Sequence, residues 1–505
     1  MRFQKRACLL LALLVAISLA FGGTIAAAED STVKQINIYS LNAFHGRLEA
    51  DRGTPGAAVV SAYIKNYLNP ETDILVDAGN YLQGTAVSTA TYGAPVVDFY
   101  NAIGMTATVV GNHEFDWGVA RLAETMAKAD FPLLSANIVN ADKSAIDWAQ
   151  PYTLVERDGI TIGIIGLINP SHRSAINVDY LKGLVIEDAA EIANALIPKV
   201  RAEGADIVVL VGTIGGLTDD AGVAYGDLID FAGKVQGADA IVGSLHATVS
   251  TKVNGVPVVQ AYRYGTMLGH IALSYDTETN TVVDSGVEVL PIDGNPLALE
   301  ADSDVAAIVA GYADELNATY SVTVATLANA LTRGAGVESA IGNWVTDSMR
   351  ESAQTQIAFT NPGGLRADLP AGDININSIY EVMPFPNTVV HGEMTGAQLK
   401  SFLEQVAAVG IIPISGVKFT YDLSKDAGGR FVSVTLSDGS PIEDEAVYTV
   451  ATNNFLAGGT DGYTELANVE WTDTAVLVRD AMIENVKANG TISEELEGRL
   501  VDLAK

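Results

Sequence analysis

The chain has 505 residues, 48% of them hydrophobic, and a formal net charge of −32. A chain of this length can hold two or three domains, each with its own core. The strong acidity excludes nucleic-acid polymers and anionic membranes as expected partners, because both repel a negative surface. An anionic small molecule would need a locally positive pocket.

The first 28 residues have the pattern of a secretory signal peptide. Three basic residues precede an apolar run over residues 7–21, and an alanine triplet ends at Ala28. We expect cleavage there and a secreted, extracellular or periplasmic product with a net charge of about −35. A membrane anchor is the alternative, but the run is short for a span. The single cysteine, Cys8, would leave with the signal peptide, and no later stretch is apolar enough to cross a membrane.

Short β-branched segments alternate with alanine-rich amphipathic segments over the first 290 residues. Continuous apolar strands between helices predict a layered α/β domain with buried sheets. In such folds ligands bind beyond the carboxyl ends of the strands, where this sequence places Asn, His, Thr and Ser residues. The expected strands lie at 36–42, 73–80, 107–114, 161–169, 206–213, 239–244 and 256–262, and the expected helices at 56–68, 119–129, 187–203 and 224–235.

The hydrophobic periodicity lapses over 291–303, and a helical pattern follows over 303–320. We therefore expect the first α/β domain to end near this point. The expected organisation is a signal peptide at 1–28, a first domain at 33–290, a linker and helix at 291–321, and a smaller α/β domain at 322–505.

Five sequence blocks together resemble the secreted 5′-nucleotidases, a family that includes UDP-sugar hydrolases and cyclic-nucleotide phosphodiesterases. They are "DAGNYLQGT" (77–85), "GNHEFDWG" (111–118), "LSANI" (134–138), "NPGGLR" (361–366) and "FLAGGTDGY" (455–463). The resemblance implies an N-terminal metallophosphatase domain, a four-layer α/β/β/α sandwich that holds two divalent metals. It also implies a C-terminal domain that recognises the nucleotide.

The metal positions implied by this resemblance are mostly replaced. The block that reads Asn-Asp-x-His-Gly in the family has Ala43 in place of the aspartate and keeps His45. The aspartate that would bridge the two metals is Asn80, whereas "GNHE" keeps a ligand position at Asn112 and the catalytic position at His113. The remaining ligand positions are occupied by Thr213, Leu245 and Ala247.

Five such replacements predict that the chain holds no metal cofactor. Two doubly charged cations in one site need anionic ligands and a bridging group, which these residues do not supply. A divalent metal such as Mn²⁺ or Zn²⁺ would need carboxylates from elsewhere, and Asp77, Glu114 and Asp116 are the candidates. We expect His246, which lies between two lost positions, to face away from its neighbours, because side chains alternate along a strand.

The substrate-binding positions implied by the resemblance are better preserved. In "NPGGLR", Gly364 permits a tight turn near a ligand, and Arg366 offers a fork of donors to a phosphate or carboxylate. The resemblance implies that Arg366 contacts the phosphate or ribose side of the substrate. In "FLAGGTDGY", Phe455 matches a ring that stacks on the base and Asp461 matches an acid that binds the ribose. The position of a second stacking ring aligns with Ile411.

Three functional interpretations follow. The first is a secreted family member that is catalytically impaired and still binds a nucleotide or nucleoside. The second is an active metal-dependent phosphoric ester hydrolase with a rearranged or single metal, in which His113 assists the reaction. The third is an extracellular interaction protein on the same scaffold, whose protein partner the sequence does not specify.

Overall fold

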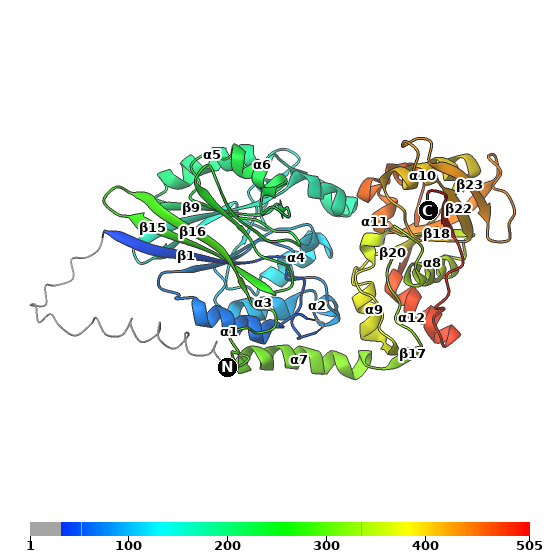
Figure 1. Ribbon diagram of the computed structural model, residues 1–505, viewed down its shortest axis with the longest axis horizontal. Coiled ribbons are helices and arrows are strands. Elements are labelled where there is room, and N and C mark those ends of the chain that lie inside the picture. The colour runs from blue at the N-terminus through cyan, green and yellow to red at the C-terminus, as the bar shows by residue number, and fades with distance from the viewer. Residues whose placement is uncertain (1–31, 52, 335) are drawn as a thin grey trace, which may run out of the picture.

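The computed structural model describes residues 32–51, 53–334 and 336–505, which form two α/β domains joined by a long helix (Figure 1). The signal peptide expected at 1–28 lies outside the described residues. The predicted fold class is confirmed. Among the residues that are described, no helix is long and apolar enough to span a bilayer.

The N-terminal domain contains two six-stranded sheets. The first has the order β16-β15-β1-β2-β3-β4 and the second the order β13-β14-β12-β9-β7-β6. The first comprises β1 (Val33–Leu41), β2 (Ile74–Asp77), β3 (Ala107–Val109), β4 (Leu133–Leu134), β15 (Met267–Asp276) and β16 (Thr281–Pro291). The second comprises β6 (Tyr152–Arg157), β7 (Ile160–Ile168), β9 (Ile207–Thr213), β12 (Ala240–Val242), β13 (Val249–Val253) and β14 (Val256–Gln260).

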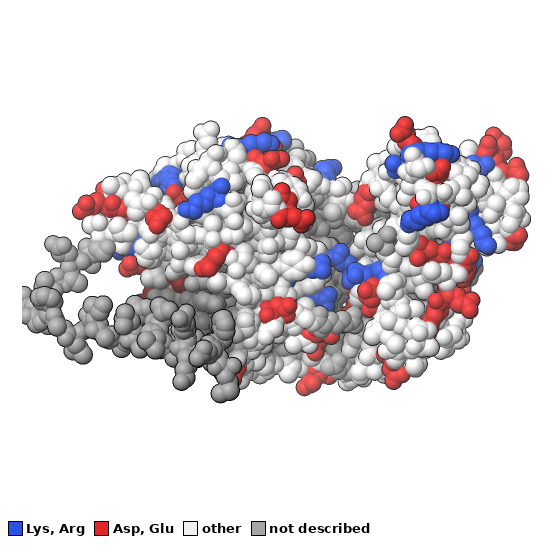
Figure 2. Space-filling model, viewed as in Figure 1, with Lys and Arg blue, Asp and Glu red and all other residues white. Residues whose placement is uncertain are grey.

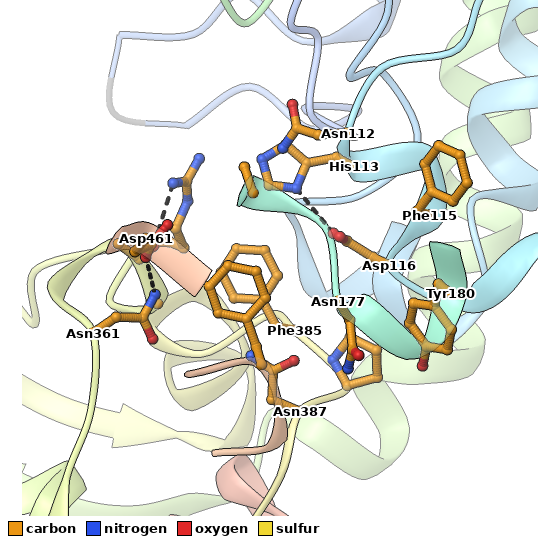
Figure 3. A pocket seen from close by; sticks show the side chains of 16 residues that line it. Asn112, His113, Phe115, Asp116, Asn177, Tyr180, Asn361, Phe385, Asn387 and Asp461 are labelled. Atoms are coloured by element: carbon orange, nitrogen blue, oxygen red, sulfur yellow. Dashed lines mark hydrogen bonds and ion pairs between the residues drawn. The ribbon is translucent and has the colours of Figure 1, made fainter. Parts of the chain in front are cut away.

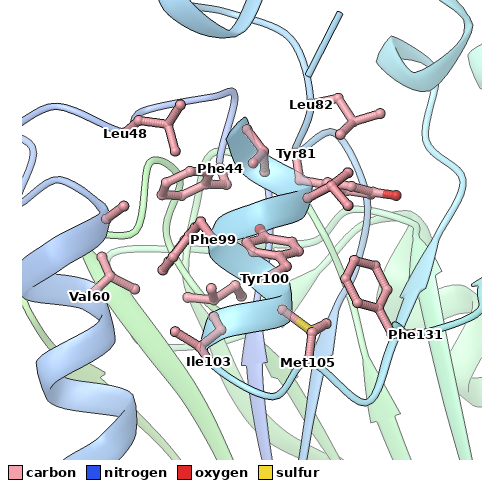
Figure 4. Close-up of a cluster of buried hydrophobic side chains, with 14 of the residues drawn as sticks. Phe44, Leu48, Val60, Tyr81, Leu82, Phe99, Tyr100, Ile103, Met105 and Phe131 are labelled. Atoms are coloured by element: carbon pink, nitrogen blue, oxygen red, sulfur yellow. The ribbon is translucent and has the colours of Figure 1, made fainter. Parts of the chain in front are cut away.

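Three apolar layers hold this domain together. Side chains such as Ile38, Ile164 and Val209 fill the space between the two sheets. On the outer side of the first sheet, an aromatic cluster around Phe44 and Tyr100 packs beneath the helices (Figure 4). The helices on that side are α1 (Ala57–Tyr67), α3 (Ala94–Ala102) and α4 (Gly118–Met126), and those over the second sheet are α5 (Ala189–Ala202) and α6 (Asp227–Lys234).

The carboxyl ends of the parallel strands meet at one edge of the sandwich. β1, β2 and β3 pair in parallel in one sheet, and β7, β9 and β12 do so in the other. Backbone hydrogen bonds tie the loops that follow: Ala43 N donates to Gly79 O at 3.0 Å, and Tyr264 N donates to Ala43 O at 2.9 Å. This edge therefore gathers the residues that the sequence singled out.

Helix α7 (Ser303–Tyr320) leads from the first domain into the second (Figure 1). The second domain has a five-stranded sheet of order β21-β18-β24-β20-β25. Its strands are β18 (Ile357–Phe359), β20 (Thr388–Thr395), β21 (Ile414–Ser415), β24 (Val447–Asn453) and β25 (Thr472–Leu477). Helices α8 (Ala340–Ala353), α9 (Ile376–Val382), α10 (Gly396–Val409), α11 (Asn454–Ala457) and α12 (Val478–Asn489) surround it, beside a smaller sheet of β22 (Val417–Tyr421), β23 (Phe431–Leu436) and β26 (Leu500–Asp502).

Candidate functional site

A cleft lies between the two domains and is lined by residues of both. Figure 3 shows His113 and Asp116 of the first domain opposite Asn361, Asp461 and Phe385 of the second. The cleft is lined by Asn112, His113, Phe115, Asp116, Ala175, Asn177, Tyr180, Asn361, Gly363, Gly364, Arg366, Phe385, Pro386, Asn387, Phe455 and Asp461.

On the N-terminal wall, two asparagines bond each other. Asn80 Nδ2 donates to Asn112 Oδ1 at 3.1 Å, and Asn80 Oδ1 accepts the backbone N–H of His113 at 3.1 Å. The His113 ring is held from the other side, since its Nδ1 lies 3.0 Å from Asp116 Oδ2. A carboxylate that accepts a hydrogen bond from one ring nitrogen fixes the orientation of an imidazole. His113 is therefore positioned at the cleft, whereas Asn80 and Asn112 satisfy each other.

Glu114 fixes the two loops that carry these asparagines. Its carboxylate is fully buried and accepts four backbone N–H groups: those of Asn80 and Gly111 on Oε2, and those of Tyr81 and Leu82 on Oε1. Burial raises the pKa of Glu114, and the backbone donors of Asn80, Gly111 and Tyr81 oppose that shift. Glu114 is therefore a support for the loops and has no carboxylate oxygen left over for a ligand.

His45 and His246 form a hydrogen-bonded pair whose proton positions follow from their neighbours. Arg263 Nη1 lies 3.2 Å from His246 Nδ1, the two Nε2 atoms lie 3.5 Å apart, and His45 Nδ1 lies 3.1 Å from Gln83 O. A guanidinium only donates and a carbonyl only accepts. The chain therefore runs from Arg263 to His246, from His246 Nε2–H to His45 Nε2, and from His45 Nδ1–H to Gln83 O.

Both rings of this pair are neutral at physiological pH. Burial lowers the pKa of His45 well below its ordinary value, and the neighbouring His113, Arg366 and His246 lower it further. Burial together with the charge of Arg263 lowers the pKa of His246 to about 4. In the neutral pair every ring nitrogen has a partner already, so neither imidazole has a lone pair to spare.

The backbone at this edge is held in an uncommon conformation. Ala43, His45, Asn80 and Tyr264 have φ values of 48°, 52°, 62° and 66°. The left-handed region costs a non-glycine residue about 1–2 kcal/mol, so such residues persist only where surrounding contacts hold them. Clustered outliers of this kind are typical of binding sites.

The C-terminal wall presents a guanidinium and two aromatic rings. Arg366 Cζ lies 5.7 Å from the centre of the Phe385 ring, which stacks on His113 with ring centres 5.7 Å apart. Phe455, on α11, also lines the cleft, and the hydroxyl of Thr460 donates to its carbonyl at 2.6 Å. The two domains thus meet at His113 and Phe385.

A polar chain positions Asp461 at the same wall. Asn453 Nδ2 donates to Asn361 Oδ1 at 3.1 Å, and Asn361 Nδ2 donates to Asp461 Oδ2 at 2.9 Å. Asp461 has a φ of 53°, in the left-handed region that non-glycine residues seldom adopt. One carboxylate oxygen of Asp461 is bound by this chain, and Oδ1 can accept from a hydroxyl in the cleft.

Comparisons of the sequence and of the structure with known proteins point to the same family. Residues 315–468 match the family model described as the 5′-nucleotidase C-terminal domain. A snake venom 5′-nucleotidase of Gloydius brevicauda is 28% identical over 85% of this chain and 80% of its own length. The crystal structure of a 5′-nucleotidase precursor from Thermus thermophilus has a TM-score of 0.78 at 27% identity, and the match covers 94% of this chain and 100% of that one. The chain belongs to the 5′-nucleotidase family.

A longer relative shares this unit as well. The trifunctional nucleotide phosphoesterase protein YfkN of Bacillus subtilis (strain 168) is 29% identical over 87% of this chain. The chain spans 33% of the length of that relative.

The residues at the metal positions of the 5′-nucleotidase family do not fit a two-metal centre. Ala43, Leu245 and Ala247 have no side-chain donor atom, and Leu245 is 39% exposed. Thr213 Oγ1 donates to Ala78 O at 2.8 Å, so its hydroxyl joins strand ends. Over the ranges that the structure describes, no group of three or more His, Cys, Asp or Glu residues is placed to hold a metal ion.

The expectation for His246 was wrong. The residue lies in a bend beyond β12, which ends at Val242, so strand alternation does not apply to it. Its ring instead faces His45, with ring centres 5.6 Å apart. The structure brings the other predicted site residues together. Six of them line the cleft: Asn112, His113, Gly364, Arg366, Phe455 and Asp461. His45 and Asn80 lie behind it, hydrogen-bonded to His246 and Asn112 respectively.

Several site residues escaped the sequence analysis. Phe385 lies between two prolines in "MPFPNT", and its ring lines the cleft. Ile411, the aligned residue, is buried in the C-terminal core. Arg263 lies in the loop that follows the strand "VPVVQ", after Ala261 and Tyr262, and its place beyond a strand's carboxyl end was the available signal.

Asp77, next to the asparagine loop, predicts a pH dependence of stability. Its buried carboxyl accepts from Tyr100 Oη at 2.7 Å and from Gly79 N at 2.7 Å, and burial raises its pKa to about 7. A pKa raised on folding stabilises the protein at low pH, and that stability is lost as pH rises from about 4 to about 7. In Asp77→Asn, which resembles the protonated acid, we expect the free energy of unfolding to fall by roughly 2 kcal/mol less than in the wild type over this range. Urea denaturation at several pH values measures the free energy of unfolding of both proteins. The same dependence of that free energy on pH in Asp77→Asn and in the wild type would contradict the prediction.

Proposed function

We propose that this member of the 5′-nucleotidase family binds a nucleotide and has lost two-metal hydrolysis. One observation carries the proposal: the side chains at the inherited metal positions either have no atom that can bind a metal or already bond other groups of the protein, while the opposite wall has a guanidinium, aromatic rings and a carboxylate. Loss of the metal ligands together with retention of the substrate-binding groups is best explained by a protein that binds a nucleotide without hydrolysing it.

Each part of a nucleoside monophosphate has a counterpart in the cleft. Phe455 and Phe385 offer apolar faces to a base, since every base can stack on an aromatic ring. Asp461 Oδ1 accepts from a ribose hydroxyl, and the guanidinium of Arg366 binds the phosphate. The ligand would therefore contact both domains.

Phe455→Ala tests the base-binding role. Loss of one stacking ring costs about 1–3 kcal/mol, so we expect the Kd for AMP and for adenosine to rise by roughly tenfold. Isothermal titration calorimetry measures both. The control is Tyr225→Ala, which removes a ring that is 49% exposed and lies outside the cleft. Equal affinities for Phe455→Ala and the wild type would contradict nucleoside binding here.

A catalytic test completes the proposal. We expect no enzyme-dependent phosphate release from nucleoside monophosphates with Mn²⁺, Zn²⁺, Co²⁺ or Ca²⁺ added, because the donor set does not support two metals. Multiple turnover with any of these ions would overturn the loss of hydrolysis.

A second candidate function has one observation in its favour. His113 is oriented by Asp116 and faces the cleft, an arrangement suited to proton transfer to a leaving oxygen. Under this proposal the protein hydrolyses phosphoric esters with a rearranged or single metal. Phosphate release that His113→Ala abolishes would support it, whereas release unaffected by that substitution would count against it.

We also propose that the protein acts outside the cytoplasm. The basic and apolar pattern before residue 28 supports export, and one relative is described as a snake venom enzyme. Fractionation of cells that express the full chain tests this, with the cleaved protein expected outside the cytoplasm.

A further inference from the structure

Arginines gather behind the cleft in a protein that is otherwise strongly acidic. The guanidinium carbons of Arg47 and Arg263 both lie 4.7 Å from the centre of the Tyr264 ring. Arg366 approaches from the other domain; burial lowers its pKa, and the charges of Arg333 and Arg263 lower it further. Figure 2 shows basic side chains concentrated where the two domains face each other. With a net charge of −32 on the chain, such a concentration needs an explanation.

These guanidinium groups are not neutralised by the protein. Within the part of the chain that the structure describes, no ion pair joins Arg47, Arg263 or Arg366 to a carboxylate. Arg366 donates one long bond, 3.4 Å, to Gly363 O. Asp116 acts electrostatically on Arg366 but is bonded to His113.

Two of the donors are also buried without an acceptor. The Nε atoms of Arg47 and Arg263 have no hydrogen-bond partner and almost no solvent contact. Buried donors of this kind cost free energy until an acceptor reaches them. His246 Nδ1 accepts from Nη1 of Arg263 at 3.2 Å and so holds that guanidinium in place.

We propose that the phosphate group of the ligand is bound without a metal, between Arg366 of the second domain, which lines the cleft, and Arg263 of the first, which lies behind it beside the His45–His246 pair. This inference rests on the proposed nucleotide-binding function and names the group that replaces the metals. In the family, as the resemblance implies, two cations would supply the positive charge at this wall. Here a guanidinium supplies it, and its planar fork of donors matches the oxygens of a tetrahedral dianion.

The histidine pair explains how the arginine replaces a metal. His246 accepts from Arg263 and donates to His45, so both rings support the guanidinium instead of presenting lone pairs. The charge introduced at Arg263 in turn disfavours a cation at the same place. Metal binding and arginine-mediated phosphate binding therefore exclude each other at this wall.

The first experiment compares three probes in excess EDTA by calorimetry: AMP, adenosine and inorganic phosphate. We expect AMP to bind at least about tenfold more tightly than adenosine, because the phosphate adds charge-assisted hydrogen bonds. Inorganic phosphate should bind weakly and compete with AMP. Loss of AMP binding in EDTA that Mn²⁺ restores would overturn the inference.

The second experiment identifies the arginine. In Arg263→Gln we expect AMP and phosphate affinities to fall by roughly tenfold or more, with adenosine affinity unchanged within about twofold. Arg263→Lys should recover part of the loss, since it restores charge without the fork. The control is Arg121→Gln, an exposed arginine paired with Glu124 outside the cleft. Equal AMP affinity in Arg263→Gln and wild type would refute the assignment, and the melting temperature of each variant shows that it is folded.

The outcomes separate this inference from the proposed function. If adenosine binds and AMP binds no better, nucleoside binding stands and the phosphate site fails. If phosphate binds through Arg263 and adenosine does not bind, the phosphate site stands and its source is the free anion. If none of the three probes binds in EDTA, the phosphate site fails in any case.

Discussion

Glu114→Ala is expected to lower the free energy of unfolding of the N-terminal domain by about 4 kcal/mol. The substitution leaves four buried backbone N–H groups without an acceptor, each worth roughly 1–3 kcal/mol, and removing the buried carboxylate offsets part of that loss. Urea denaturation followed by the fluorescence of Trp117 and Trp148, both in this domain, measures the change.

Two further variants serve as an intermediate case and as a control. Glu114→Gln keeps one acceptor oxygen and places an amide donor against backbone donors, so we expect an intermediate loss. Glu124→Ala removes a carboxylate that is 64% exposed and should change stability by no more than about 0.5 kcal/mol. A loss below about 1 kcal/mol in Glu114→Ala would show that the loops at Asn80 and Gly111 do not depend on this carboxylate.

Arg366→Ala is expected to raise the Kd for AMP by about 100-fold. The guanidinium lies against Phe385 at the meeting point of both domains and makes no ion pair with the residues described, so its removal acts on the ligand more than on the fold. A charged hydrogen-bond donor that binds an anion through two N–H groups contributes about 3 kcal/mol, which corresponds to this factor.

The control variant for Arg366→Ala also removes one positive charge, but away from the cleft. Lys487→Ala removes a cation of the C-terminal domain whose side chain is 50% exposed and should leave AMP affinity unchanged. In Arg366→Ala the affinity for adenosine should change little, because the nucleoside carries no phosphate. A Kd for AMP within threefold of wild type would contradict the role of Arg366.

Much of the fold was predictable because the hydrophobic pattern has a strong period. The apolar segments at 36–42, 161–169 and 206–213 are β1, β7 and β9, and the amphipathic segment at 187–203 is α5. In each case burial on both faces of a strand, or on one stripe of a helix, determines which residues are apolar. Such local signals need no knowledge of the partner segment.

The site was predictable only in part, because its contacts join segments that are far apart in the sequence. Motif residues such as His113 and Arg366 were found by resemblance, and the structure brings both to one cleft. The pairing of His45 with His246 joins residues 201 positions apart, so nothing local records it. The direction of His246 was predicted wrongly because a bend, and not a strand, carries it.

The hydrogen-bonded chain from Arg263 through His246 to His45 has a consequence for restoring a metal site. Restoring an aspartate at Ala43 alone would set a carboxylate beside rings whose nitrogens are all engaged and beside an arginine charge. Restoring it at Asn80 alone would remove the hydrogen bond that Asn80 Nδ2 donates to Asn112 Oδ1, without freeing the imidazoles. Under the proposed loss of two-metal hydrolysis, neither substitution by itself supplies the ligands of an ion site, so metal binding would need several changes made together.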